Sequence, residues 1–334
     1  MTDKFVLALV LSGVATHAAA QDGFEWEGEL ELGVETVVSS DIEGNEITDA
    51  YGVLELGGSL SFGTNGSAFF TILGESVEDP TDDRLLEDIG FYFEEIGVAF
   101  DIGTSTSISL GKVNPSFGRT FDDAAGMYGD IVAGDYELTE QIGVFAESEL
   151  TPGGTLSFGV FYADDTFLSR SIGTDRGRNT VDAGGAGNTG RLDNLAVTWT
   201  QDYKNGAFQV GARHLSAGMG DVSDETGVIA SVTHNLSEQF FVFAEAAHFS
   251  NFGGGADDAT YVTLNAGYTI DNWSLSGTVG RRDLDGGGVT DAISVSAEYA
   301  FKNGNVLGTG LAFIDDGGSK ETLFGVNLIV PFGG

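Results

Sequence analysis

The feature that most constrains this chain is a two-residue alternation of apolar with polar or small side chains, repeated in segments of about ten residues. In the first segment the apolar set shares one parity: Phe24, Trp26, Leu30, Leu32 and Val34. The opposite parity is acidic: Glu25, Glu27, Glu29, Glu31 and Glu35. Because successive side chains of a β-strand point to opposite faces, this segment predicts a strand with one apolar face and one face of carboxylates.

About sixteen segments follow this pattern, which is an even number, as bacterial membrane barrels have. After the segment that begins at Phe24, they are Ala50–Phe62, Gly66–Glu75, Asp88–Ile102, Ser105–Lys112, Glu140–Leu150, Gly154–Asp164, Leu192–Gln201, Gly206–Ser216, Thr226–Asn235, Gln239–Phe249, Asp258–Ile270, Asn272–Arg282, Asp291–Phe301, Asn305–Asp315 and Glu321–Phe332.

The links between the segments alternate between tight turns and longer loops. Gly63-Thr64-Asn65 and Thr151-Pro152-Gly153 are examples of the tight turns, whereas 76–87, 113–139 and 165–191 are long. Tight turns on one side and long loops on the other are typical of an outer-membrane barrel, and a Greek-key sandwich gives no reason for such regularity. The sequence therefore predicts an all-β fold, a transmembrane antiparallel up-and-down β-barrel.

One break in the alternation falls at Glu94-Glu95. The apolar residues before it, such as Phe91, are at odd positions, and those after it, such as Ile96, are at even positions. An extra residue on one strand shifts parity in this way, so the break indicates a β-bulge or a misplaced strand edge.

The first twenty residues have the pattern of a secretory signal peptide. Lys4 precedes an apolar run, Phe5 to Val14, and Ala18-Ala19-Ala20 gives the small residues of a cleavage site before Gln21. A membrane anchor is the alternative, but the run is shorter than the roughly 20 residues of a spanning helix. We therefore expect residues 1–20 to be removed and residues 21–334 to form the exported barrel.

Composition excludes several classes of function. The chain carries 51 acidic and 14 basic residues, for a net charge of −37, and has no cysteine. Binding to nucleic acid is not expected, because neutralising phosphates needs clustered Lys and Arg. Thiolate sites are excluded, and four histidines scattered through the chain do not predict a zinc site.

Two motifs carry a resemblance to a known family. The last segment alternates and ends in the aromatic Phe332, although Gly333-Gly334 follow it, and Pro115-Ser116-Phe117-Gly118 lies in the third long link. The chain resembles the sixteen-stranded general porins of Gram-negative bacteria, whose constriction loop opens with a Pro-x-Phe-Gly motif. The resemblance implies a homotrimer in outer-membrane lipid, with residues 113–139 folded into the lumen. It also implies passive diffusion of small hydrophilic solutes.

On that basis the candidate residues of a pore constriction are the charged ones of the third loop: Arg119, Asp122, Asp123, Asp130, Asp135 and Glu137. In a narrow passage, carboxylates attract cations and disfavour anions. The alternative is a solvated external loop whose acids bind divalent cations loosely. We expect no cofactor apart from such loosely bound calcium or magnesium.

The predicted lumen wall is also mainly acidic. Inward parity falls on Glu25, Glu27, Glu29, Glu31, Glu147, Glu149, Arg213 and Arg282, whereas Lys112 falls on the outward parity. With so few inward bases, a strong transverse field across the pore is not expected. The sequence predicts a preference for cations.

Two other functions are compatible with a barrel. One is an adhesin or a specific uptake protein with a blocked lumen. The other is a hydrolase on the barrel wall, for which His214 with Ser216 and His248 with Ser250 are candidates, because residues two apart share a strand face. No G-x-S-x-G motif supports the hydrolase. The fragment Asp283-Leu284-Asp285-Gly286 lacks the later Glu of a calcium loop.

Overall fold

The computed structural model describes residues 23–333, so the predicted signal peptide lies outside the described residues. The strands are β1 (Phe24–Ser40), β2 (Thr48–Phe62), β3 (Gly66–Ser76), β4 (Arg84–Leu85), β5 (Ile89–Ile102), β6 (Thr106–Val113), β7 (Gln141–Thr151), β8 (Gly154–Ala163), β9 (Ile172–Gly173), β10 (Asn194–Tyr203), β11 (Gly206–Leu215), β12 (Glu225–Asn235), β13 (Phe240–Ser250), β14 (Ala259–Ile270), β15 (Trp273–Leu284), β16 (Gly288–Ala300), β17 (Val306–Asp316) and β18 (Ser319–Gly333).

Helical structure is confined to single turns in the links: α1 (Thr120–Asp123), η1 (Gly134–Tyr136), η2 (Phe167–Ser169), η3 (Val181–Ala183) and η4 (Phe252–Gly254). Among residues 23–333 no helix is long and apolar enough to cross a membrane.

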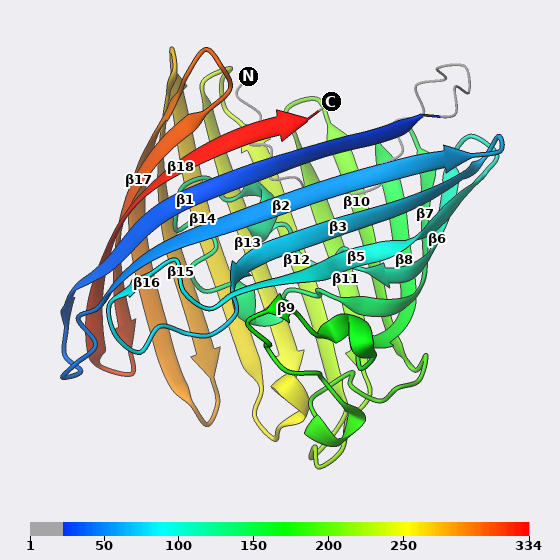
Figure 1. Cartoon of the computed structure of the whole chain (residues 1–334), viewed down its shortest axis with the longest axis horizontal. Helices are drawn as coiled ribbons and strands as arrows, with labels where there is room; N and C mark the ends of the chain where they lie inside the picture. Colours follow the sequence, from blue (N-terminus) through cyan, green and yellow to red (C-terminus); the bar gives the residue numbers. More distant parts are fainter. Residues whose placement is uncertain (1–22, 334) are drawn as a thin grey trace.

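The sixteen long strands form one antiparallel sheet that closes on itself (Figure 1). β1 pairs with β2 on one side and with β18 on the other, where Leu30 stands opposite Val330. The two-residue strands β4 and β9 are additions to β2 and β5. Closure gives every long strand two neighbouring strands, so none of them is an edge strand of the sheet. The predicted sixteen-stranded up-and-down barrel is confirmed.

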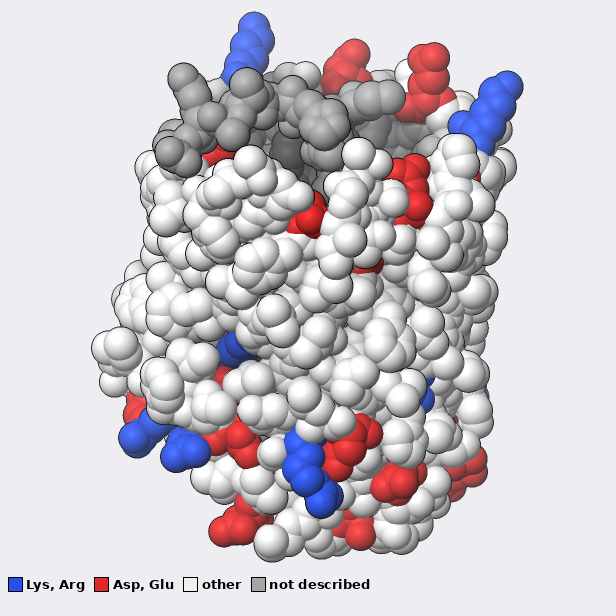
Figure 2. Space-filling view, turned by 90° about the vertical axis from the view of Figure 1, so that its right-hand side faces the viewer, with Lys and Arg blue, Asp and Glu red and all other residues white. Residues whose placement is uncertain are grey.

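The two faces of the sheet divide as the alternation predicts. In β14, Val262 and Leu264 are 36% and 51% exposed on the outer face, whereas Tyr261 and Thr263 are each 1% exposed on the inner face. Figure 2 shows the consequence on one side of the molecule: charged side chains gather at the two rims, and the belt between them is almost free of charge. A barrel surface of this kind suits hydrocarbon.

Aromatic side chains line the outer face near the tight turns. Trp26 packs against Phe332 with 6.1 Å between ring centroids, and Trp273 lies 5.0 Å from Tyr299. Such rings are favoured where a barrel crosses from hydrocarbon to the headgroup layer.

The predicted bulge is confirmed at Glu94. Thr71 on β3 stands opposite Glu95, and the next residue, Ile72, stands opposite Phe93, so Glu94 has no partner in the pairing of β3 with β5. The extra residue restores the outward parity for the rest of β5 and brings two adjacent carboxylates toward the barrel interior.

A lipid-facing position near the middle of β14 gives a test of this arrangement. We expect Leu264→Arg to destabilise the barrel in phospholipid vesicles by about 2–4 kcal/mol, because the charge must enter hydrocarbon. Ile270→Arg, on the same face but beside a tight turn, is the control and is expected to cost about 0–1 kcal/mol. Denaturant titration of folded protein in vesicles measures both. Equal costs would contradict the assigned depth of the two positions.

Candidate functional site

The link between β6 and β7, residues 114–140, turns into the barrel, and we call it the inner loop. It leaves the wall at Asn114, whose backbone N–H and side-chain Nδ2 donate to Glu95 Oε1 and Glu94 Oε1, both at 2.9 Å. Asn114 Oδ1 accepts from the N–H of Glu140 at 2.7 Å, which joins the two ends of the loop. The bulge therefore supplies the two carboxylates that fix the point of departure.

The strongest anchor of the inner loop on the far wall is Glu245 of β13, which is 2% exposed. Its Oε2 accepts from the backbone N–H of Arg119 at 2.6 Å. Its Oε1 accepts from the Thr120 hydroxyl at 2.5 Å and from the Tyr136 hydroxyl at 2.7 Å. Hydrogen bonds to an ionised acceptor are stronger than neutral ones, so this single carboxylate holds both α1 and η1 against the wall.

An apolar cluster fills the space between the inner loop and the far wall. Tyr136 packs edge-on against Tyr261 at 4.9 Å between centroids and also contacts Phe249, and Phe117 lies 6.1 Å from Phe249. All four side chains are 7% exposed or less. This part of the barrel interior is packed like a protein core.

The tip of the inner loop crosses to β14 and beyond. The backbone N–H of Ala125 donates to Asn265 Oδ1 at 3.0 Å, and Asn265 Nδ2 donates back to the Ala125 carbonyl at 2.8 Å. The Tyr128 carbonyl accepts from Ser294 Oγ at 3.0 Å. Met127 and Tyr128 abut Gly310 and Gly325, where a Cβ atom would collide with their side chains. The loop thus divides the lumen into a packed half and an open half.

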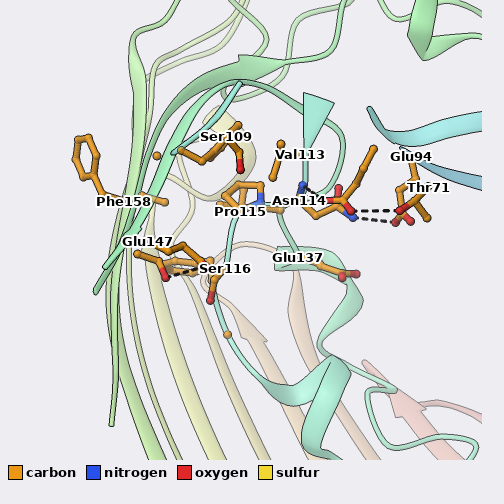
Figure 3. Close-up of a pocket in the computed structure, with 18 of the residues that line it drawn as sticks. Thr71, Glu94, Ser109, Val113, Asn114, Pro115, Ser116, Glu137, Glu147 and Phe158 are labelled. Carbon is orange, nitrogen blue, oxygen red and sulfur yellow. Dashed lines mark hydrogen bonds between the residues drawn. The ribbon is translucent and has the colours of Figure 1, made fainter. Parts of the chain in front are cut away.

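The open half contains a cavity of about 240 Å³ between the inner loop and strands β2 to β8, shown in Figure 3, and we call it the acidic cavity. Its lining contains no Lys or Arg. Six carboxyl side chains line it: Glu55, Glu94, Glu95, Asp122, Glu137 and Glu147. They come from both sides, because Asp122 and Glu137 belong to the inner loop and the other four belong to the wall.

Desolvation inside the barrel, together with neighbouring negative charge, raises the pKa values of two loop carboxyls. Burial raises the pKa of Glu137 to about 7, and the charges of Glu94, Asp122 and Asp130 act in the same direction. Burial and the neighbouring Asp123 also raise the pKa of Asp122 above its ordinary range. Near neutral pH the charge of the cavity therefore depends on pH.

The other charged residues expected in the constriction lie beside partners. Arg119 forms an ion pair with Asp123 at 2.5 Å. Asp135 faces the wall, where it accepts from Tyr261 at 3.0 Å and pairs with Arg282 at 2.9 Å. Asp130 is exposed.

The two inward arginines of the wall lie on the packed side of the inner loop. Arg213, 5% exposed, pairs with Glu225 at 2.8 Å and donates to the Tyr136 carbonyl at 2.6 Å. Arg282 pairs with Asp135 and, at 3.4 Å, with Asp316. Both guanidinium groups thus neutralise acids and hold the loop.

The acidic face of β1 lies on the open side of the barrel. Glu25 and Glu27 are exposed near the tight turns, and the carboxylate of Glu31 accepts from Tyr51 at 2.7 Å and from Asn327 at 2.8 Å. Glu29 stands opposite Glu55 on β2. These carboxylates extend the negative lining beyond the acidic cavity.

Lys112 has an environment that its strand parity does not reveal. It stands opposite Ile142 on the outward parity, yet it is 1% exposed. Its ammonium group lies 2.6 Å from Glu140 and 3.0 Å from Asp164. Arg176 also binds Glu140 and stacks on Tyr92, with 3.5 Å from its guanidinium carbon to the ring centroid.

This ion-pair cluster closes the wall where the inner loop departs. β6 pairs with β5 only as far as Ile96, so the earlier part of β5 lacks that neighbour. β9, from the long link between β8 and β10, pairs with Gly90 and Phe91 instead, as Figure 1 shows near the middle of the view. The long link thus continues the sheet across the gap.

In the part of the chain that the structure describes, neither candidate histidine is hydrogen-bonded to its serine. The Ser216 hydroxyl donates to the Asp193 carbonyl at 3.0 Å, while His214 lies 3.8 Å from Asp224. His248 shares a hydrogen bond of 3.0 Å with Thr260 on the outer face. Within residues 23–333 no set of three or more His, Asp or Glu side chains has the geometry to hold a metal ion.

Sequence reasoning missed Glu245, Lys112 and the carboxyls at the bulge as structural residues. The sequence of β13 does contain a signal for the role of Glu245. It is the one charged residue on the inward face of that strand, which it shares with Phe241, Phe243, Ala247 and Phe249. A lone acid on an apolar inward face predicts a donor from elsewhere in the chain.

Comparison with known proteins supports the fold. No protein-family model and no curated protein sequence matches the chain. Similar solved structures include the outer membrane channel DcaP of Acinetobacter baumannii, at 13% identity and a TM-score of 0.65, over 94% of this chain and 99% of that one. An anion-selective porin from Comamonas acidovorans has 14% identity and a TM-score of 0.65, over 93% and 99%.

A further similar structure is OprB of Pseudomonas putida, with 11% identity, a TM-score of 0.68, and coverage of 93% of this chain and 94% of that one. The structural neighbours are thus outer-membrane porins, and at these identities the likeness shows the fold.

Removing the Glu245 carboxylate tests the anchoring of the inner loop. In Glu245→Ala three donors lose their acceptor, each at a cost of about 1–3 kcal/mol, so we expect the loop to separate from the wall while the barrel stays closed. Hydrogen exchange at the amides of residues 118–136 should accelerate by at least about tenfold. The control is Thr263→Val, since that buried hydroxyl has no hydrogen-bond partner. Unchanged exchange in Glu245→Ala would contradict the anchoring role.

Proposed function

We propose that the chain forms a water-filled channel in the outer membrane of a Gram-negative bacterium, through which small hydrophilic solutes diffuse passively and cations pass in preference to anions. The observation that carries this proposal is the acidic cavity, whose lining has six carboxyl groups and no base. The sixteen-stranded fold, its likeness to porins and its apolar outer belt support the location.

The direction of the charge preference follows from the division of the lumen by the inner loop. Arg213 and Arg282 lie on the packed side, where Glu225 and Asp135 neutralise their charges. The two arginines therefore contribute little positive potential to the open side. Carboxylates on both sides of a narrow passage lower the energy of a cation and raise that of an anion. One structural neighbour is named an anion-selective porin, and we propose the opposite preference for this chain.

No catalytic turnover belongs to this proposal. The resemblance of the sequence to general porins further implies a homotrimer. A blocked lumen, as in an adhesin, is the competing possibility, and channel recordings separate the two.

The direct test is single-channel recording in planar bilayers with a KCl gradient. The purified protein should show stepwise currents and a reversal potential on the side of potassium. Glu94→Gln, Glu95→Gln and Glu137→Gln combined should move the reversal potential toward zero, because three lining charges are removed.

The matched control removes three exposed carboxylates in or beside the tight turns: Asp202→Asn, Glu238→Gln and Asp271→Asn. It should leave the reversal potential unchanged. Equal shifts in both triple variants would assign selectivity to net charge and not to the cavity, and absence of any current would contradict the channel.

Selectivity should also depend on pH through Glu137. With a pKa of about 7, its carboxyl is mostly charged at pH 8 and mostly neutral at pH 6. The potassium preference should therefore fall as pH falls through 7, and Glu137→Gln should lessen that fall. Reversal potentials recorded at pH 8 and pH 6 measure the effect. A preference for potassium that rises on acidification would contradict the assignment.

A further inference from the structure

The acidic cavity has an apolar component that small inorganic cations do not need. Besides its carboxyls, its lining includes the rings of Phe69 on β3, Phe145 on β7 and Phe117 and Phe121 of the inner loop. Phe69 and Phe145 lie on wall strands and point inward, at 3% and 7% exposure. Phe158 also borders the cavity, but its ring points away from it, as Figure 3 shows, and is 45% exposed on the outer face.

One carboxylate of the cavity has an unused acceptor. Glu55 Oε1 is shielded from solvent by the protein and has no hydrogen-bond partner. By contrast, Glu95 accepts from Asn114 at 2.9 Å and from Thr71 at 3.3 Å, and Glu147 accepts from Ser157 at 3.2 Å. A shielded carboxylate oxygen without a donor is costly unless a ligand supplies one.

We propose that the acidic cavity is a binding site for organic ammonium cations that carry an apolar or aromatic body. This inference rests on the proposed function and names the solute class for which the passage is built. The ammonium group would lie among the carboxyl groups of the lining, and the Glu55 side chain would turn to accept from it. The apolar body would lie against the rings of Phe69 and Phe145.

The chemistry of the lining selects this class over three others. Anions are repelled by every charged group of the cavity. Neutral aromatic solutes gain the ring contacts but bring no positive charge to the six carboxyl groups. Inorganic cations are attracted by the carboxyl groups but keep a hydration shell that cannot pack against phenylalanine. An organic ammonium ion satisfies both components, because a ring face and a carboxylate each attract its charge.

The experiment measures potassium current through the full barrel while benzylammonium chloride is added on one side. Benzylammonium should reduce the current saturably, at concentrations at which the size-matched neutral benzyl alcohol does not. Glu55→Gln should weaken the block about tenfold, since the amide oxygen still accepts but the charge of the acceptor is lost. Phe69→Leu and Phe145→Leu should each weaken it about threefold.

The matched control is Phe158→Leu, the same change at a ring that points out of the cavity, and it should leave the block unchanged. Potassium conductance without blocker, compared for all variants, shows that each barrel is folded. Calorimetric titration of the wild-type protein in detergent gives a second measurement of benzylammonium binding.

The outcomes separate the two proposals. A potassium-selective current with no benzylammonium block, or a block that Phe158→Leu weakens as much as Phe69→Leu, overturns this inference and leaves the channel intact. Equal block by benzyl alcohol also overturns it, because charge would then play no part. Absence of potassium current from folded protein overturns the proposed function, and this inference falls with it.

Discussion

The structure depends on the requirement that every backbone donor and acceptor of the wall have a partner. Closure of β1 on β18 meets that requirement around the barrel, but the pairing is interrupted where β6 ends and the inner loop turns inward at Asn114. The early part of β5 then lacks one neighbour. β9 supplies the missing pairing, and the buried Lys112, with Glu140 and Asp164, fills the space behind it. An inward loop and a sealed wall are therefore one structural solution.

The same loop determines where charge acts. By packing against strands from β11 to β18 it encloses Arg213 with Glu225 and brings Asp135 to Arg282, so that both inward arginines of the wall are paired with acids. What remains on the open side is the carboxyl-rich lining of the acidic cavity. A large negative net charge alone does not dictate this result, since a chain can place its acids on outer loops. The separation arises because one loop sorts paired from unpaired charges.

The barrel could be predicted from the sequence because strand alternation is local: Leu264 faces out and Thr263 faces in, as parity requires. The bulge at Glu94 could be predicted for the same reason. The roles of Lys112 and Glu245 could not be predicted, because each depends on a partner far along the chain. Parity placed Lys112 on the lipid side, and only the long link after β8 encloses it. Parity gave Arg213 an inward direction but could not tell which half of the lumen it faces.

Cysteine accessibility tests most directly whether the inner loop leaves only one side of the lumen open, since the chain has no cysteine of its own. Ser107→Cys and Ser157→Cys line the acidic cavity, whereas Ser231→Cys and Thr263→Cys lie buried on the packed side. A positively charged methanethiosulfonate reagent added to the open channel should modify the first two and reduce the current, and should leave the second two unmodified. Equal modification of all four would contradict the division of the lumen.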